Sequence, residues 1–458
     1  MRLRRADLAG RVNGVLRFRF TDRKLTSHAG LELLREYLTG RHFNRKLRGV
    51  LGADFPSSDF GVVRLVRLIL ALVLAGGRRL WHLRYLVADP IVQRFCGLRR
   101  IPTAMTVSAW LRQLTHQHMR MLQEFNADLT AETIRHTGLR RLTLDIDGSV
   151  LSTGLQVEGA RRGFNPHHRK APSYYPITAY EAQSGQMLRV ENRAGNVHDG
   201  KASLPFLRDL VEQIEVRLGS GHTLEFRMDG AFFRQDVVEF IDGRGADWAI
   251  KVPFYPWLHL KSYVAQAPAW NQVADGVFAC EARVWIKTWQ RMLRIVLYRK
   301  RVLHLTAKNF QLDLFDPNDG YWEYSAIATN KTLSARGLWH FLNGRGAHEK
   351  ALGELKSGFA FDAVPTLRYG ANSAWQLLSL LAFNLARGFQ IAAGAPRRST
   401  NRKRQCCYRF DSIHTLRFKL LGRAGLLTAP AGKKILDLGP VVAVADQFER
   451  AIQHLRAA

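Results

Sequence analysis

The sequence contains few cysteines, a deficit of acidic residues and no long apolar segment. The longest apolar runs, Leu68–Ala75 and Leu377–Leu385, are much shorter than the about 20 residues that a membrane-spanning helix requires. The first residues, MRLRRADLAGRV, lack the apolar stretch of a signal peptide. We therefore expect a protein of the reducing cytoplasm without zinc, because the cysteines have no metal-binding spacing. These cysteines are Cys96, Cys280, Cys406 and Cys407.

The deficit of acidic residues leaves a strongly basic chain. In 458 residues, 68 lysines and arginines face 38 aspartates and glutamates, for a formal charge of +30. The hydrophobic content of 47% excludes a mostly disordered basic tail, and the length predicts two to four domains. A folded protein this basic needs an anionic partner, and the spread of the charge favours nucleic acid over a membrane surface. Composition alone also allows a ribosome-associated or merely basic protein.

The N-terminal third has the apolar spacing of helices. Leu31, Leu34 and Leu38 follow a cap-like serine at helical intervals. Further along, a short helix beginning at Asp89-Pro90, a turn containing proline and a second helix over 107–114 are compatible with a helix-turn-helix that reads DNA. An ordinary packing unit of two helices explains the same pattern equally well.

From Arg141 the period changes to two. Leu142, Leu144 and Ile146 alternate with Thr143, Asp145 and Asp147, which predicts a strand with both aspartates on one face. A hairpin follows, then a helix over 202–217, a strand over 223–228, a second helix and a strand over 248–252. The order βββαβαβ is that of an RNase H-like domain.

Residues after 253 interrupt this pattern with tryptophan-rich strands, and helices resume near Ser334. We expect an α/β protein with an RNase H-like catalytic core, a mixed sheet flanked by helices, interrupted by a β-rich insertion. The expected segments are a helical, DNA-binding domain over 1–138, the core over 139–253 and 331–395, the insertion over 254–330, and a basic linker with a helical tail over 396–458.

Three carboxylates are the candidates for chemistry. Asp147 on the first strand, Asp229 at the end of the fourth and Glu349 on a later helix meet if the fold is RNase H-like. Like charges brought together imply cations, and two Mg²⁺ or Mn²⁺ ions about 3.5–4 Å apart would activate a nucleophile and stabilise a leaving oxygen at a phosphodiester.

Each carboxylate also has a simpler interpretation. Asp145 competes with Asp147 for the first position; we favour Asp147 because Gly148 follows it, where DNA can approach the backbone closely. Asp229 is suited to cap a helix, and Glu349 to pair with Arg345 four residues earlier on one helical face. Arg345 and Lys356 flank Glu349 on that face and are expected to contact phosphates.

These residues resemble a bacterial insertion-sequence DDE transposase of the group with a Tyr-x2-Arg-x3-Glu-x6-Lys signature. Arg345, Glu349 and Lys356 match its last three positions with both spacings intact. The segments 144–149, 163–176, 195–198, 227–233 and 372–385 are also similar. The signature tyrosine falls on Leu342, so its hydroxyl is missing, and a neighbouring ring, Phe341 or Trp339, is expected to provide stacking only.

The resemblance implies metal-dependent cleavage at the ends of a mobile element and strand transfer into target DNA. It implies double-stranded DNA as partner and a homodimer on DNA, with neither a membrane nor a nucleotide cofactor. An RNase H-like nuclease without strand transfer and a noncatalytic repressor derived from a transposase are the alternatives. A basic run after the first strand is expected to contact the DNA backbone, although a solvated loop explains it equally well; its residues are Arg161, Arg162, Arg169 and Lys170.

Overall fold

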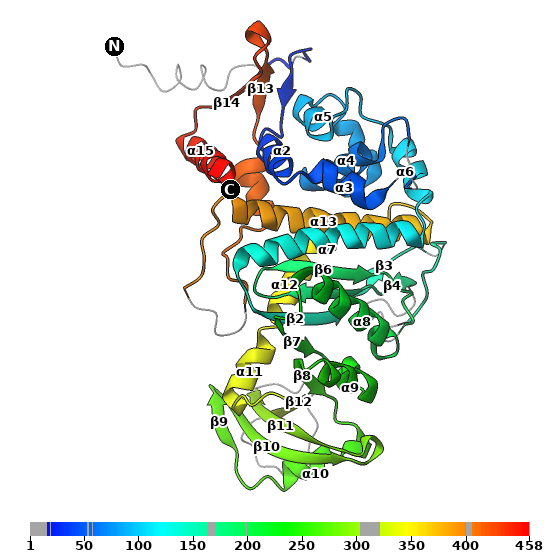
Figure 1. Cartoon of the computed structure of the whole chain (residues 1–458), viewed down its shortest axis with the longest axis vertical. Helices are drawn as coiled ribbons and strands as arrows, with labels where there is room; N and C mark the ends of the chain where they lie inside the picture. Colours follow the sequence, from blue (N-terminus) through cyan, green and yellow to red (C-terminus); the bar gives the residue numbers. More distant parts are fainter. Residues whose placement is uncertain are drawn as a thin grey trace.

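A nine-stranded sheet runs through the core domain and continues into the β-rich region of the protein (Figure 1). The computed structural model describes residues 16–18, 20–52, 55–56, 58–154, 156–163, 171–197, 199–302, 321–399 and 405–457. Helical layers lie at one end of the elongated molecule, and a β-rich region lies at the other. The strand order across the sheet is β6-β5-β2-β7-β8-β12-β11-β10-β9.

The first five strands have RNase H-like topology, as the sequence predicted. β5 is antiparallel to both β6 and β2, whereas β2, β7 and β8 run parallel to one another. Helix α8 connects β6 to β7, and α9 connects β7 to β8. The elements are β2 (Arg141–Gly148), β5 (Ile177–Glu181), β6 (Gln186–Glu191), α8 (Asp199–Leu218), β7 (Thr223–Met228), α9 (Gln235–Gly243) and β8 (Asp247–Val252).

The two faces of this core sheet differ in polarity. Leu144 and Ile146 of β2 belong to an apolar cluster with residues of α8 and α9. The opposite face of β2 carries Thr143, Asp145 and Asp147, as the period of two predicted. On this side, the sheet is covered by α11 (Ala335–Asn343) and α12 (Gly346–Phe359).

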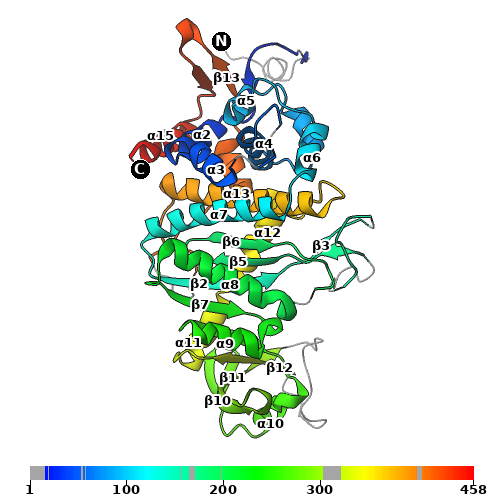
Figure 2. The same cartoon turned by 45° about the vertical axis from the view of Figure 1, so that its right-hand side comes forward.

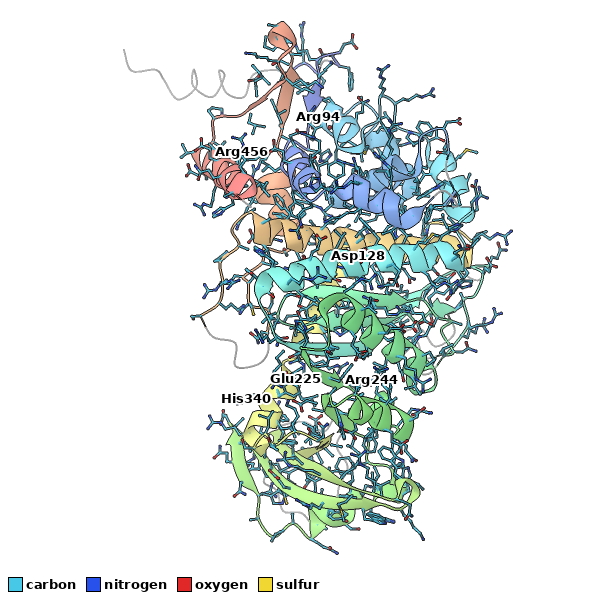
Figure 3. The ribbon with its side chains drawn as sticks, viewed as in Figure 1. Arg94, Asp128, Glu225, Arg244, His340 and Arg456 are labelled. Carbon is cyan, nitrogen blue, oxygen red and sulfur yellow. The ribbon has the colours of Figure 1, made fainter. Side chains whose placement is uncertain are left out.

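The tryptophan-rich segment extends the core sheet. β12 pairs antiparallel with β8, so the strands expected as an insertion continue the hydrogen-bonded ladder of the core. Glu225, at the junction between the two parts (Figure 3), is fully buried and forms ion pairs with Arg141 and Lys331. This region contains η3 (Pro256–Leu258), α10 (Leu260–Ala265), β9 (Asn271–Ala274), β10 (Val277–Ile286), η4 (Lys287–Trp289), β11 (Arg291–Val302) and β12 (Tyr321–Thr329).

The N-terminal helices share one apolar core with the helices that follow the sheet. α7 and α13 lie side by side above the sheet in both views (Figures 1 and 2). Among the described residues, no helix has the length and apolar character to cross a membrane. The helices are α2 (Leu31–Gly40), α3 (Phe43–Leu51), α4 (Val62–Leu74), η1 (Leu80–Tyr85), α5 (Pro90–Cys96), α6 (Ala104–Arg112), α7 (His116–Thr137) and α13 (Tyr369–Ala392).

The C-terminal region contains a β-hairpin in addition to the expected helix. β13 (Gly425–Thr428) pairs with both β14 (Ile435–Leu438) and β1 (Leu25–Thr26) near the N-terminus. The two hairpin strands, GLLT and ILDL, have only four residues each, which is too short to separate a strand from a loop by periodicity. The remaining elements are β3 (Leu151–Ser152), β4 (Ser173–Tyr174), α14 (Ile413–Leu416), the π-helical turn η5 (Arg417–Leu421), η6 (Pro430–Gly432) and α15 (Val442–Ala457).

Candidate active site

Asp147 and Asp229 lie at equivalent places on adjacent parallel strands. The last paired residues of β2 and β7 are Ile146 and Met228, and each aspartate is the next residue in its chain. Residues in register on neighbouring strands project from the same face of a sheet. Asp229 also has the capping role that its sequence context suggested, because its Oδ1 accepts a hydrogen bond from the Ala231 amide at 3.0 Å.

Asp147 is mostly buried and pairs with an arginine. Its side chain is 16% exposed, and its Oδ2 lies 2.6 Å from Nη2 of Arg345. Burial raises the pKa of Asp147 to about 6; the charges of Asp229 and Asp199 add to this effect, and Arg345 opposes it. The two aspartates of the predicted site are therefore close enough for the charge of Asp229 to raise the pKa of Asp147.

Arg345 connects the strand ends to Glu349. Arg345 immediately precedes α12, and its Nη1 lies 3.9 Å from Oε1 of Glu349, whose side chain is 63% exposed. Burial alone would lower the pKa of Arg345, but the surrounding carboxylates, Asp147 foremost, raise it above its usual value. The predicted pairing of Arg345 with Glu349 is thus present, with the shorter contact made to Asp147.

The three candidate carboxylates are chemically suited to bind a divalent ion, but they are not arranged as a preformed metal site. Carboxylate oxygens are the ligands that Mg²⁺ and Mn²⁺ prefer. Within the described part of the chain, however, no group of three histidine, cysteine, aspartate or glutamate residues is positioned to hold a metal ion. Arg345 supplies the positive charge beside Asp147. The same arginine also contacts Glu349 and so lies between the two carboxylates.

Asp145, the alternative first carboxylate, is paired inside the protein. Arg227 Nε donates to its Oδ1 at 2.5 Å and Nη2 to its Oδ2 at 2.7 Å, and both side chains are fully buried. Nη1 of the same arginine donates to the Phe341 carbonyl at 2.9 Å. Both carboxylate oxygens of Asp145 are therefore engaged by one guanidinium that joins β2, β7 and the end of α11.

The predicted phosphate-binding residues lie in different environments. Lys356 Nζ donates to the carbonyl of Val150 at 3.2 Å, and burial lowers the pKa of this lysine. Arg161 and Arg162 are exposed on the loop after β3. Glu354, five residues after Glu349 on α12, pairs with Arg387 of α13. Arg169 and Lys170 lie outside the described residues.

A buried network beside Asp147 was not identified from the sequence. Asp199 is 3% exposed, forms an ion pair with Arg193 and accepts a hydrogen bond from the Tyr175 hydroxyl at 2.9 Å. A Cβ at Gly148 would lie 2.5 Å from both oxygens of Asp199. Glycine is therefore required here by close packing against Asp199. The only sequence signal was the position of Asp199, directly after the family-like segment 195–198.

Leu342, which replaces the signature tyrosine, is 5% exposed in an apolar cluster with Phe341, itself 4% exposed. Arg227 and Lys331 both lie over the Phe341 ring. Phe341 is thus an internal packing residue in this structure. Trp339 is partly buried and packs on Tyr298, with ring centroids 5.0 Å apart.

Comparison with known proteins identifies one family. The family described as Transposase DDE domain group 1 matches residues 11–458. A piggyBac transposase, solved as a synaptic complex with hairpin DNA, is 8% identical, with a TM-score of 0.42 over 86% of this chain and 80% of that chain. A comparison with curated proteins found no match.

Proposed function

This chain belongs to the family described as Transposase DDE domain group 1, and from that premise we propose that it cleaves the ends of a mobile DNA element and joins them to target DNA. The reaction is phosphodiester hydrolysis followed by transesterification. Double-stranded DNA is the proposed partner, in keeping with the formal charge of +30. We also propose that the protein acts on DNA as a homodimer.

The observation that supports this proposal best is the register of Asp147 and Asp229. Each carboxylate directly follows one of two adjacent parallel strands, and Arg345 and Glu349 lie beside these strand ends. This arrangement supports the proposal that cations bind there together with DNA. Members of the family generally use divalent metal ions. In our proposal Asp147, Asp229 and Glu349 hold two such ions, Mg²⁺ or Mn²⁺, which would polarise the phosphate and stabilise the attacking and leaving oxygens.

The neighbouring cations have separate proposed roles. Arg345 balances the charge of Asp147 in the metal-free protein and contacts a phosphate when DNA is present. Lys356 is held at the end of β2 by the Val150 carbonyl and offers a second positive charge beside the reacting strand. Asp145 is proposed to have no metal-binding role, because Arg227 occupies both of its oxygens.

The test is a cleavage and strand-transfer assay with Mg²⁺ and DNA carrying the element's ends. We expect Asp147→Asn, Asp229→Asn and Glu349→Gln each to reduce cleavage by at least about 10³-fold, with folding and DNA binding retained. Retained cleavage in one variant would remove that residue from the site. Glu354→Gln is a matched control, because Glu354 lies on the same helix and pairs with Arg387.

The alternative functions give different outcomes in the same assay. Cleavage without joining would favour a nuclease, and a Glu349→Gln variant with every cellular phenotype unchanged would favour a noncatalytic repressor. DNA affinity should fall steeply with salt, since binding to many phosphates releases counterions. An affinity independent of salt would contradict the charge argument, and sedimentation of the DNA complex would test the dimer.

A further inference from the structure

A groove of about 1010 Å³ lies beside the strand that leaves the candidate active site. One wall is formed by η1 and α6, and the other by β3 and the segment after α12. In both views α6 lies above β3 at the same side of the molecule (Figures 1 and 2). The lining includes Arg79, Trp81, Met105, Arg112, Ser152 and Pro365.

The groove begins close to Asp147. Ser152, which lines it, follows Asp147 by five residues, so at about 3.3 Å per residue the two are at most about 17 Å apart. Between them, the Val150 carbonyl accepts the hydrogen bond from Lys356. Since successive nucleotides of a strand in duplex DNA are about 3.4 Å apart, a strand in the groove would be bound within roughly five nucleotides of the reacting phosphate.

The charge of the groove favours an anion. Arg78 is neutralised by Asp362, with 2.7 Å between Nη2 and Oδ1, and it also donates to the carbonyls of Lys356 and Ser357. Arg79 and Arg112 are exposed, and neither forms an ion pair with any residue that the structure describes. Two positive charges therefore remain available to a ligand.

The groove also exposes apolar surface suited to a base. Trp81 is 44% exposed, and Met105, from the other lining helix, is 81% exposed. The indole ring is held edge-on against His82, with 4.4 Å between ring centroids, and Arg84 lies 6.0 Å from its centre. A positively charged groove with an exposed aromatic ring is the arrangement by which proteins bind single-stranded nucleic acid.

We propose that this groove binds an unpaired strand of DNA next to the reacting phosphate, with Arg79 and Arg112 contacting phosphates and Trp81 stacking on a base. Base faces are covered inside a duplex, so Trp81 finds such a partner only in an unpaired strand. The inference rests on the proposed transposase function. Under this proposal, the exposed face of α6 lines the groove. The sequence had left open that a helix in this region reads duplex DNA.

The experiment measures binding to the full chain without metal, so that it does not depend on cleavage. Fluorescence anisotropy would compare a labelled oligothymidine of about 12 nucleotides, within the size that such sites cover, with a duplex of the same length. In Arg79→Ala/Trp81→Ala we expect affinity for the single strand to fall tenfold or more, about 1.4 kcal/mol or above. Affinity for the duplex should fall less than threefold.

The matched control is Arg283→Ala/Trp285→Ala on β10, where an exposed arginine and a 50% exposed tryptophan have the same spacing. It should change neither affinity by more than threefold. Trp81→Phe should retain the affinity of the unaltered protein, because an aromatic ring remains. If Arg79→Ala/Trp81→Ala lost affinity equally for single-stranded and duplex DNA, the groove would bind duplex DNA. If neither affinity changed, the groove would bind no DNA. Either outcome would overturn the proposal. Loss of cleavage with binding selectivity intact would instead count against the proposed function alone.

Discussion

Two aspartates on one strand show how differently the same residue can be used. Asp145 and Asp147 share a face of β2, and each lies beside an arginine. Arg227 binds both oxygens of Asp145 in the interior, whereas Arg345 contacts only Oδ2 of Asp147, at the strand end. Asp145 is therefore held by the fold, while Asp147 keeps an oxygen without a hydrogen-bond partner among the described residues.

The energetic consequence is opposite at the two positions. A fully buried charge must be paired, and removal of one partner leaves the other uncompensated in a medium of low dielectric constant. At the strand end, nearby Asp229 and Glu349 still balance Arg345 when Asp147 is neutralised. The inner pair should thus govern stability, and the outer pair should govern chemistry.

The largest effect is expected for Asp145→Asn. The asparagine carries no charge, so the guanidinium of Arg227 would stay buried without its counter-ion, at a cost of about 3–5 kcal/mol in the free energy of unfolding. Urea denaturation followed by circular dichroism measures this loss. Asp147→Asn is the comparison and should lose clearly less; equal losses would remove the distinction between the two pairs.

The second effect is a pH dependence specific to Asp147. Its pKa is raised from 3.8 to about 6, so between these values the folded protein binds more protons than the unfolded chain, and its free energy of unfolding falls as pH rises. Asp147→Asn lacks this dependence. From about pH 4 to about pH 7, the variant should gain roughly 2–3 kcal/mol relative to the unaltered protein, since one pKa unit is about 1.36 kcal/mol.

Denaturation at several pH values checks this change, with Asp275→Asn in the exposed turn before β10 as the control. A constant difference between Asp147→Asn and the unaltered protein would show that burial of Asp147 has no such effect.

A smaller loss is expected for Gly148→Ala. The new Cβ would approach Asp199 and Tyr175 to 2.5 Å, and Asp199 is fixed by Arg193, so we expect about 1–3 kcal/mol of destabilisation. Displacement of Asp147 should also reduce cleavage. Gly353→Ala on α12 is the control, because nothing lies within 4 Å of its added Cβ; it should stabilise the helix by up to about 1 kcal/mol. Equal behaviour of the two variants would exclude crowding at Gly148.

The smallest effect concerns the signature position. Leu342→Tyr should destabilise the protein by about 1–2 kcal/mol, because a hydroxyl enters an apolar cluster, and it should not increase cleavage. Thermal unfolding and the cleavage assay test this, with Leu342→Met as the volume-conserving control. An increase in cleavage would mean that the missing hydroxyl limits this protein.

Much of the core was predictable because strand periodicity is local. The alternation in 142–147 placed both aspartates on one face, and the order of strands and helices predicted the RNase H-like sheet that is observed. The extension of the sheet through β12 was not predictable, since pairing between β8 and β12 joins residues 74 to 80 positions apart in the sequence. The Asp199 network was missed for the same reason: its partners come from separate segments.

By itself, the sequence determined the basic character of the chain, the face of β2 that carries acids and the spacing of Arg345, Glu349 and Lys356 on one helix. These properties depend on composition and on neighbours within about three helical turns or a few strand residues. Only the tertiary structure decided that Arg227 forms an ion pair with Asp145 and that Arg345 forms one with Asp147. Pairing depends on which side chains the fold buries together, and burial is a property of the whole chain.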